Sequence, residues 1–563
     1  MYRGQLGNID LGSSDFRNFI ENNLLLVDKS AFIEHVLNDS STVLLFTRPR
    51  RMGKSLNLDM LRAFLDSNQD ARGEGLFKGL YIEGSPVFAQ AGSRPVIHLN
   101  FRDMGKDSYR GDFIIRFMPQ LARYLRESQY SANMRLVLAE PRTYTHQLLR
   151  TLIENIHEVH GVKPFVLIDE YDKPVMDSAG TEKSDEIRGF INSLLSMALK
   201  DNHSLGKCIL TGVNRIAHES MFSDLNNLAV YSVLSESVFD TDFGFTEEEV
   251  SELCKGKRLT EAREWYNGYR IGKEKVYFTF SVMSYLKYGA LDNYWGRSGI
   301  VSSIRSHLNA DRFDTIAEII GDADDTSVRT NIKDRLSAED MLGYTSEAAF
   351  YSLLVQAGYM TYDRTDTLNQ YDIYLPNSEL RSVWQEFILN EVYNEPAAAI
   401  VGALGLVAEP ARFASAFTEF VNNKLSYFDF EATAPEKTYH IFVCGLLAAS
   451  GVRFSSNRES GLGRYDVMAF LADKTIIFEF KRAEAGPGTV LASEETGLVT
   501  CKKGAEVFVP PEVTAAIESA AAKAIKQIED RGYAVDAPAA LPVYAAGIGF
   551  EGKLCSALAK RIR

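Results

Sequence analysis

Residues 43–55 read VLLFTRPRRMGKS, and this stretch decides the fold of the first half of the chain. The apolar run at residues 43–46 is typical of a strand that is buried on both faces of a sheet. Beyond residue 55, apolar residues recur at helical spacing: Leu56, Met60, Leu61, Phe64 and Leu65. A strand, a basic loop and a helix in this order predict a phosphate-binding loop, because the first N–H groups of a helix attract anions.

Gly53, Lys54 and Ser55 carry this prediction. We expect Lys54 to reach the β- and γ-phosphates of a nucleotide and the Ser55 hydroxyl to bind Mg²⁺. The usual pattern begins with a glycine, which this chain replaces by an arginine. Three arginines are candidates for additional phosphate contacts: Arg48, Arg50 and Arg51. For the loop alone, an ordinary strand–turn–helix with a solvated basic patch is the alternative interpretation.

Strand and helix signals alternate up to residue 213. Strands are predicted at residues 95–101, 165–168 and 208–213, and helices at residues 144–160 and 185–200. Strands that are separated by helices imply right-handed crossovers and a mostly parallel sheet. We therefore expect an α/β fold here, with ligands bound at the carboxyl ends of the strands.

The strand at residues 165–168 runs into Asp169 and Glu170, as a Walker B strand does. We expect Asp169 to hold Mg²⁺ and Glu170 to orient the attacking water, with Asp172 close by. An apolar strand that ends in acids is common by itself. Here it follows the GKS loop by about 115 residues within an α/β pattern, which makes the signal specific.

Polar residues also end the next strand, at the same edge of the sheet. Thr211, Asn214 and Arg215 are therefore candidates for contact with the γ-phosphate. Simple loop polarity explains these three residues equally well.

Six short segments stand out together: VDKS at 27–30, TRPRRMGKS at 47–55, IDEYD at 168–172, TGV at 211–213, FSDLNNL at 222–228 and WYNGY at 265–269. As a set they resemble the AAA-ATPase-like family of bacterial ATP-binding proteins, over about residues 5 to 285. In that family an arginine-rich loop replaces the glycine-rich one. The resemblance implies a P-loop ATPase domain with ATP and Mg²⁺ as its ligands.

The character of the sequence changes near Thr246, where Thr246 to Glu249 form a capping box that opens a helix. From there to about residue 430 the signals are mainly helical. We therefore divide the chain into a P-loop ATPase domain at residues 1–245, a helical middle region at 246–430 and a third, α/β domain at 431–563.

The third domain contains a candidate metal site. Its predicted elements are a helix at 439–449, strands at 466–470 and 475–481 and an Ala-rich helix at 511–531. For the basic tail at 553–563 we expect a solvated last helix, with contact to nucleic acid as the alternative. Glu479 and Lys481 share a strand face, and the short turn brings Asp466 alongside. Two carboxylates on neighbouring strands can hold Mg²⁺, and a nearby lysine can assist phosphodiester cleavage. Any half-exposed strand shows the alternation of polar and apolar residues seen in Glu479–Phe480–Lys481, so this triplet alone does not establish a site.

Residues 456–466 (SNRESGLGRYD) and 477–481 (IFEFK) resemble the PD-(D/E)XK nuclease superfamily, over about residues 436 to 535. Tyr439–His440 and Gln527–Ile528 also match the branch that follows AAA-ATPase-like domains. The resemblance implies a nuclease-like domain with a catalytic core of Asp466, Glu479 and Lys481. It also implies Glu436 as a further acid and Gln527 as an accessory polar residue.

Composition limits the class of protein. The chain has 61 Lys and Arg against 75 Asp and Glu, a net charge of −14, and 45% hydrophobic residues. These values indicate globular domains. They argue against a protein that binds nucleic acid over its whole surface, as histones do, but they permit a local basic groove. The five cysteines are scattered, the first ten residues lack the apolar core of a signal peptide, and no apolar run is long enough to span a membrane. We therefore expect a cytoplasmic protein without a membrane partner.

Two functions are compatible with these observations. The first is an ATPase that is joined to a Mg²⁺-dependent nuclease, with nucleic acid, DNA above RNA, as the partner. The second is a nucleotide-regulated switch whose C-terminal domain binds nucleic acid or a protein without cutting. Either form could be a homo-oligomer.

Overall fold

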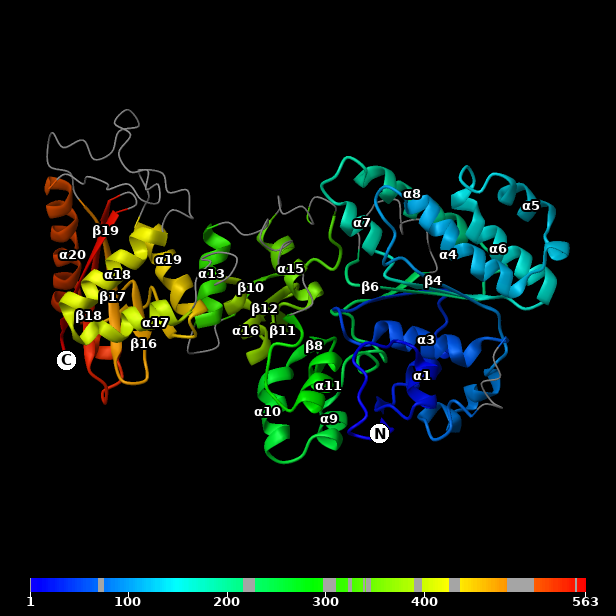
Figure 1. Ribbon diagram of the computed structural model, residues 1–563, viewed down its shortest axis with the longest axis horizontal. Coiled ribbons are helices and arrows are strands. Elements are labelled where there is room, and N and C mark those ends of the chain that lie inside the picture. Colours follow the sequence, from blue (N-terminus) through cyan, green and yellow to red (C-terminus); the bar gives the residue numbers. More distant parts are fainter. Residues whose placement is uncertain are drawn as a thin grey trace. The chain divides into compact units, whose positions relative to one another are not determined.

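The computed structural model describes residues 2–68, 75–215, 228–296, 310–321, 327–337, 340, 346–388, 397–424, 436–483, 511–551 and 554–563. They form two compact units (Figure 1). Unit 1 comprises Met1–Gly299 and Arg329–Leu380, and unit 2 comprises Ile300–Val328 and Arg381–Arg563. The division into three domains stays a prediction.

A parallel sheet forms the centre of unit 1. Its strands are β3 (Val43–Thr47), β4 (Val96–Asn100), β5 (Phe165–Asp169), β6 (Lys207–Gly212) and β7 (Leu228–Tyr231). The strand order is β4-β5-β6-β3-β7, and every neighbouring pair is parallel. The predicted parallel sheet is confirmed, and β3 and β5 are buried along their whole length, as their apolar runs indicate.

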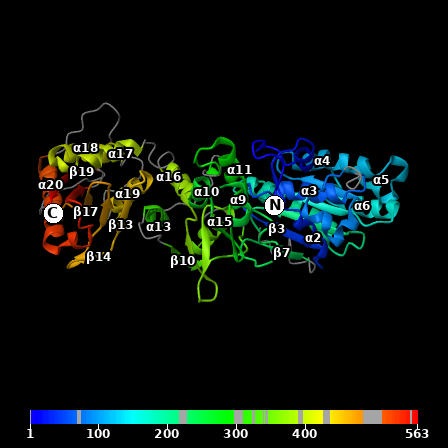
Figure 2. The same cartoon turned by 90° about the horizontal axis from the view of Figure 1, so that it is seen from below.

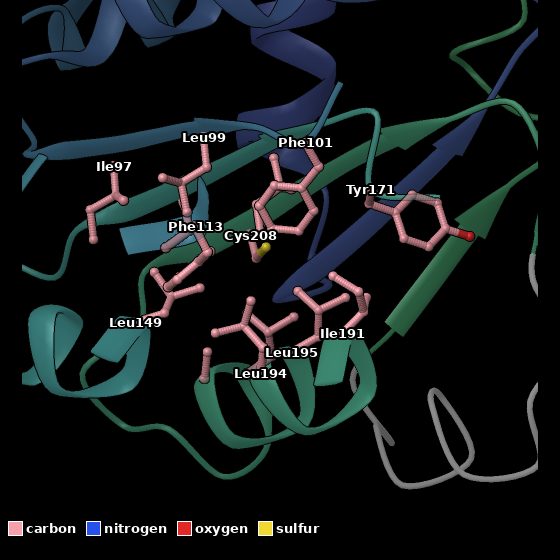
Figure 3. Close-up of a cluster of buried hydrophobic side chains, with 14 of the residues drawn as sticks. Ile97, Leu99, Phe101, Phe113, Leu149, Tyr171, Ile191, Leu194, Leu195 and Cys208 are labelled. Atoms are coloured by element: carbon pink, nitrogen blue, oxygen red, sulfur yellow. The ribbon is translucent and has the colours of Figure 1, made fainter. Parts of the chain in front are cut away.

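Helices cover both faces of this sheet. They are α1 (Phe16–Glu21), α2 (Ala31–Asn38), α3 (Lys54–Leu65), α4 (Tyr109–Tyr124), α5 (Ala132–Ala139), α6 (Thr145–His160), α7 (Lys173–Ser178) and α8 (Ser184–Leu199). Figure 1 shows α4, α6 and α8 on one face and α1 and α3 on the other. Apolar side chains of α4, α6 and α8 pack against the sheet in one large core (Figure 3). A short ladder, β1 (Tyr2–Arg3) with β2 (Leu26–Val27), lies outside it.

The rest of unit 1 mixes helices with short strands. The helices are α9 (Glu247–Leu253), α10 (Lys257–Tyr266), α11 (Thr279–Tyr288) and α15 (Glu347–Ala357). The strands are β8 (Tyr269–Ile271), β9 (Glu274–Val276), β10 (Val328–Asn331), β11 (Thr361–Arg364) and β12 (Gln370–Tyr374). The capping box at Thr246 is confirmed, with both hydrogen bonds present. The strands were missed because three to five residues show too few alternations to reveal a period of two.

Unit 2 is built on a mixed sheet. Its strands are β13 (Arg453–Ser456), β16 (Val467–Phe470), β17 (Thr475–Arg482), β18 (Val543–Glu551) and β19 (Leu554–Arg561), in the order β13-β16-β17-β18-β19. Strands β17 and β18 are parallel, and the other neighbours are antiparallel. A small hairpin joins β14 (Glu459–Ser460) to β15 (Gly463–Arg464).

The helices of unit 2 surround this sheet. They are α13 (Ala310–Gly321), α17 (Ala397–Gly405), α18 (Pro410–Lys424), α19 (Glu436–Ala449) and α20 (Pro511–Arg531). Helices α17 and α18 lie side by side in both views (Figure 1, Figure 2). Helix α20 packs closely on β18, where a Cβ at Gly547 would lie only 2.2 Å from the carbonyl oxygen of Ala521. Since Glu479 is in register with Gly547 on the parallel neighbour, Glu479 lies on the α20 side of the sheet.

The end of the chain differs from the prediction. Residues 554–561 form strand β19, which pairs antiparallel with β18, instead of a solvated last helix. The prediction was wrong because the Ala, Leu, Lys and Arg of this segment favour a helix, whereas pairing with an adjacent strand decides the outcome. Within the described ranges, no helix combines the length and apolar character that crossing a bilayer requires.

Candidate functional site

All five strands of the parallel sheet end at one edge. Strand β3 leads into the loop of residues 48–53, and α3 begins at Lys54 directly after it. Gly53 caps α3 with a φ of 83°, a left-handed conformation that side chains rarely adopt. Strand β5 ends at Asp169 and β4 at Asn100, so carboxylate and amide groups face the start of α3.

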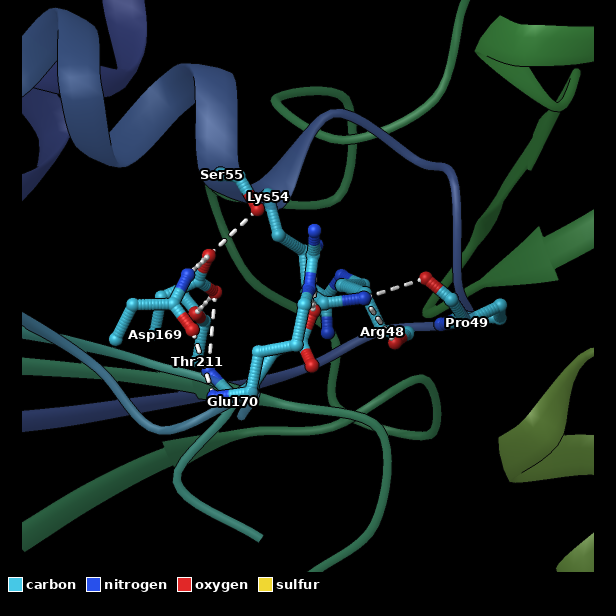
Figure 4. A network of polar contacts seen from close by, with 9 residues as sticks. Arg48, Pro49, Lys54, Ser55, Asp169, Glu170 and Thr211 are labelled. Carbon is cyan, nitrogen blue, oxygen red and sulfur yellow. Dashed lines mark hydrogen bonds and ion pairs between the residues drawn. The ribbon is translucent and has the colours of Figure 1, made fainter. Parts of the chain in front are cut away.

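Asp169 is the centre of the polar network at this edge (Figure 4). The hydroxyls of Ser55 and Thr211 each donate to its carboxylate at 2.5 Å, one to each oxygen. The amide of Asn100 donates to Oδ2 at 3.3 Å, and the backbone N–H of Glu170 donates to Oδ1 at 3.1 Å. The structure therefore brings together Ser55 and Asp169, the two residues of this edge that were predicted to bind Mg²⁺.

Lys54 lies beside this network and is almost fully buried. Its ammonium donates to the carbonyl oxygens of Arg48 at 2.9 Å and Pro49 at 2.7 Å (Figure 4). Burial lowers the pKa of Lys54 to about 8, against the opposing effect of Asp169 and Asp172. A buried cation at the first residue of a helix, hydrogen-bonded to two loop carbonyls, is placed to receive an anion.

The side chain of Arg48 is not exposed at this edge of the sheet. It is completely buried and donates to the carbonyl oxygens of Thr47 at 3.0 Å and Tyr231 at 2.6 Å. The guanidinium carbon lies 5.2 Å from the ring centre of Phe243, and burial lowers the pKa of Arg48 to about 10. Arg48 Nη1 thus ties the ends of β3 and β7 together, while Nε and Nη2 are buried without a hydrogen-bond partner. A phosphate contact by this side chain stays a prediction.

Arg50 and Arg51 follow in the same loop. The guanidinium of Arg51 stacks 3.8 Å from the ring centre of Phe280 and donates to the carbonyl oxygen of Tyr294 at 3.4 Å. The carbonyl oxygen of Arg50 accepts a hydrogen bond from the indole of Trp295 at 3.2 Å. A role of the two arginine side chains in nucleotide binding stays a prediction.

Glu170, the predicted water-orienting residue, has a φ of 53° and a partner that the sequence did not indicate. Arg102 donates to Glu170 Oε1 from Nε at 2.9 Å and from Nη2 at 2.8 Å. The Arg102 side chain is 57% exposed and that of Glu170 24% exposed, so solvent screens this pair. Glu170 therefore lies at this edge of the sheet, and its carboxylate is paired with Arg102.

Asp172 connects β5 to the loop that follows β6. It accepts hydrogen bonds from the backbone N–H groups of Val213 and Asn214, both at 2.9 Å, and burial raises its pKa. A Cβ at Gly212 would lie 2.6 Å from Asp172 Oδ1, so this close approach requires a glycine. The Asn214 side-chain oxygen is buried without a hydrogen-bond partner, whereas Arg215 forms an ion pair with Asp334.

A pocket of about 580 Å³ lies at the opposite, amino-terminal edge of the same sheet. Thr42 and Arg94 line it just before β3 and β4, and Lys163 and Lys207 line it at the start of β5 and β6. None of the predicted site residues borders this pocket.

The second candidate site lies in unit 2. In the antiparallel pair of β16 and β17, Val467 is opposite Phe478, and continuing this register by one residue places Asp466 opposite Glu479. The backbone N–H of Phe480 donates to Asp466 Oδ2 at 2.8 Å. The structure therefore brings the two predicted carboxylates to neighbouring positions on one face of the sheet.

Glu479 is buried, with its side chain 2% exposed. Its Oε1 accepts hydrogen bonds from Lys481 at 3.2 Å and from the amide of Gln527, while Oε2 has no hydrogen-bond partner. Burial, together with the nearby Asp466, raises the pKa of Glu479 to about 7. A carboxylate oxygen that is buried and unsatisfied is costly unless a further group binds it.

Two other residues complete the surroundings of this site. His440 Nε2 lies 2.7 Å from Ser456 Oγ and 3.2 Å from the carbonyl oxygen of Asp466. The imidazole is therefore close to the end of β13 and the start of β16. Glu436 begins α19, and its side chain is outside the described part of the structure. No cluster of three or more His, Cys, Asp and Glu side chains that could hold a metal occurs among the described residues, so any ion would need further oxygen ligands.

The sequence did not predict the roles of Arg102 and Asn100. It also did not predict that Lys54 and Trp295 donate hydrogen bonds to the carbonyl oxygens of the loop. Asn100 could have been found, because it ends a predicted strand at the same edge as Asp169. Arg102 lies in a loop without periodicity, and no local signal pairs it with Glu170.

Comparison with known proteins supports the nucleotide-binding part of this description. Residues 10–222 match the AAA-ATPase-like family, described as "Predicted AAA-ATPase". A protein from Azotobacter chroococcum mcd 1, described as "Uncharacterized protein in vnfD 5'region", is 27% identical over 478 residues. This similarity covers 82% of the present chain and 86% of the Azotobacter protein, so it includes both units.

Proposed function

We propose that unit 1 binds ATP together with Mg²⁺ and hydrolyses ATP. The observation that carries this proposal is the Ser55–Asp169 hydrogen bond of 2.5 Å beside the buried ammonium of Lys54 at the start of α3. A hydroxyl and a carboxylate are the oxygen ligands that Mg²⁺ prefers when phosphate oxygens complete its shell. The family match over residues 10–222 supports the same assignment.

Each residue of the edge has a role in this proposal. Lys54 would exchange the carbonyls of Arg48 and Pro49 for phosphate oxygens, and the N–H groups of α3 would bind the same anion. Ser55 and Asp169 would hold Mg²⁺, which neutralises charge on the phosphates when bound. Glu170 would orient water once it leaves Arg102.

Calorimetry with ATP and Mg²⁺ tests the assignment. Lys54→Ala should abolish binding, because the ammonium donates to two loop carbonyls and to no strand of the sheet among the described residues. Lys207→Ala is the matched control, since this partly buried lysine also donates to two carbonyls, but at the opposite edge of the sheet. Equal ATP affinity in the wild type and Lys54→Ala would reject nucleotide binding at this edge.

A second proposed function concerns unit 2, namely Mg²⁺-dependent cleavage of a phosphodiester. The specific observation is the pair of Asp466 and Glu479 on adjacent strand positions, with Lys481 at 3.2 Å from Glu479 Oε1 and with Glu479 Oε2 unpartnered. The unpartnered oxygen fits a cation. Asp466 and Glu479 would hold Mg²⁺, which supplies a polarised water and stabilises charge on phosphate.

Lys481 would act on the water or the phosphate, because an ammonium has no acceptor and cannot be a metal ligand. Gln527, which donates to Glu479, would orient that carboxylate. DNA is the favoured substrate in this proposal. In the alternative, unit 2 binds nucleic acid or a protein without cutting, and ATP controls that binding.

A nuclease assay separates these two proposals for unit 2. The full chain is incubated with Mg²⁺ and single- or double-stranded DNA or RNA, with and without ATP. Cleavage that disappears in Asp466→Asn supports the nuclease. Mg²⁺-dependent binding without cleavage by the wild type supports the alternative. Cleavage that survives in Asp466→Asn rejects the assignment of Asp466 to the catalytic core.

A further inference from the structure

Two side chains outside the phosphate-binding loop hold its backbone. The hydroxyl of Thr279, the first residue of α11, donates to the carbonyl oxygen of Arg51 at 2.8 Å. The indole N–H of Trp295 donates to the carbonyl oxygen of Arg50 at 3.2 Å. Consecutive peptide groups of the loop are therefore fixed by two segments that lie more than two hundred residues further along the chain.

Both segments converge on one buried carboxylate. Glu379 Oε1 accepts from the hydroxyl of Ser281, two residues after Thr279, and from the backbone N–H of Trp295, each at 2.9 Å. Glu379 is fully buried, and its Oε2 has no hydrogen-bond partner. Such a group costs stability relative to an apolar residue, so its presence points to a role in holding these two donors in place.

Glu379 is also the second residue of α16 (Ser378–Phe387), the helix that passes from unit 1 to unit 2. The unit boundary falls between Leu380 and Arg381. Within unit 2, the guanidinium of Arg381 donates to the carbonyl oxygen of Ile320 at the end of α13. A displacement of Glu379 along the axis of α16 would therefore move the part of this continuous helix that belongs to unit 2.

We propose that Glu379 is a positioning residue that sets the conformation of the phosphate-binding loop through Trp295 and α11, and that it transmits the nucleotide state of the loop to α16. This inference rests on the proposed binding of ATP to the loop. It identifies the side chains by which nucleotide would regulate the rest of the protein.

The packing around Trp295 makes the connection stiff. Its ring stacks on Phe278 with 5.2 Å between ring centres and meets Tyr359 edge-on at 4.9 Å. When Lys54 turns from the carbonyls of Arg48 and Pro49 to a phosphate, the peptide groups of this loop must adjust. A tightly packed indole cannot follow such a shift without moving its own peptide N–H, which Glu379 holds.

The three tryptophans of the chain, Trp265, Trp295 and Trp384, provide the test. The full chain is labelled with 5-fluorotryptophan, the resonances are assigned by single Trp→Phe variants, and ¹⁹F spectra are recorded during titration with ATP and Mg²⁺. Trp295 reports on the loop and the buried Trp384 on α16 within unit 2. We expect ATP to shift both resonances in the wild type and to leave Trp265, on α10, unchanged.

Glu379→Met removes the acceptor and keeps the length of the side chain, whereas Glu379→Gln keeps an acceptor oxygen. We expect Glu379→Met to weaken ATP binding about tenfold, as the loss of a hydrogen bond to a charged group does, and to abolish the shift of Trp384. Glu379→Gln should retain both. Glu386→Met, an exposed glutamate on the same helix, is the matched control and should behave as the wild type.

The outcomes separate this inference from the proposed function. If the wild type binds no ATP by calorimetry, the proposed function fails and the inference fails with it. If the wild type binds ATP but Trp384 does not shift, or shifts equally in ATP-saturated Glu379→Met, only the inference is rejected. An unchanged ATP affinity in Glu379→Met rejects the positioning role.

Discussion

Arg102 donates both Nε and Nη2 to one carboxylate oxygen of Glu170, at 2.9 and 2.8 Å, and so occupies the residue that is proposed to orient water for ATP hydrolysis. Glu170 follows Asp169 directly, and Asp169 is hydrogen-bonded to Ser55 of the loop. The state of this ion pair therefore bears on hydrolysis rather than on the strength of nucleotide binding.

The first prediction concerns this pair. Arg102→Ala should raise the steady-state rate of ATP hydrolysis up to about fivefold, because an exposed ion pair is worth about 1 kcal/mol and its loss frees Glu170. Arg110→Ala, which removes a comparable exposed partner of Glu186, should leave the rate unchanged. A large loss of activity in Arg102→Ala would show instead that Arg102 acts on the nucleotide.

The second prediction separates binding from chemistry. Glu170→Gln should retain ATP affinity in calorimetry and lower the hydrolysis rate by about 10²–10⁴, the usual contribution of a group that assists proton transfer. Ser55 and Asp169 are unaffected by the change. Hydrolysis at the wild-type rate by Glu170→Gln would remove Glu170 from the mechanism.

The third prediction concerns Arg48. Arg48→Ala should lower the free energy of unfolding by about 3 kcal/mol, because it leaves a cavity and two carbonyl oxygens without their donor. Urea denaturation measures this loss. ATP affinity of the folded variant should change less than about threefold, or roughly 0.7 kcal/mol. A much larger loss of affinity with normal stability would instead support a phosphate contact by Arg48.

The fourth prediction uses the pKa of Glu379, which burial raises from 4.5 to about 7. The groups that face this carboxyl are Arg51, Asp292 and Tyr266. Between pH 4.5 and 7 the folded chain holds a proton that the unfolded chain has released, so stability falls as pH rises. The loss is complete above pH 7 and amounts to about 3 kcal/mol.

Glu379→Gln cannot titrate and should lack this part of the pH dependence. Urea unfolding of the wild type and the variant at pH 5, 6, 7 and 8 measures the difference. Parallel pH profiles for the two proteins would show that Glu379 does not titrate in this range.

The fifth prediction divides the roles at the second site. Asp466→Asn should lose both Mg²⁺ binding and cleavage, whereas Lys481→Ala should lose cleavage and keep Mg²⁺ binding, since an ammonium is not a ligand. Lys560→Ala, in the same unit, removes a lysine that pairs with Glu529 and should preserve both. Calorimetry with Mg²⁺ and a cleavage assay read the two properties separately, and loss of Mg²⁺ binding in Lys481→Ala would contradict the assignment.

Much of the first site could be predicted because its signals are local. The apolar runs at β3 and β5, the GKS turn and the acids after residue 168 lie within short stretches, and the structure brings Ser55 and Asp169 together. The helix predicted at residues 511–531 is α20 with the same bounds, since its periodicity is continuous. The match of Asp466 with Glu479 followed from a short turn, which sets the register of a hairpin.

The sequence by itself determined the main strands of the parallel sheet, their alternation with helices and the residue types at the strand ends, because periodicity, caps and turns act over a few neighbouring residues. Only the tertiary structure decided which distant groups meet. Glu379 reaches Trp295 across 84 positions, and Arg102 reaches Glu170 across 68. It also decided that residues 554–561 pair with β18 as a strand. These outcomes depend on burial and on partners from other elements, and no local pattern encodes which partner a buried polar group will find.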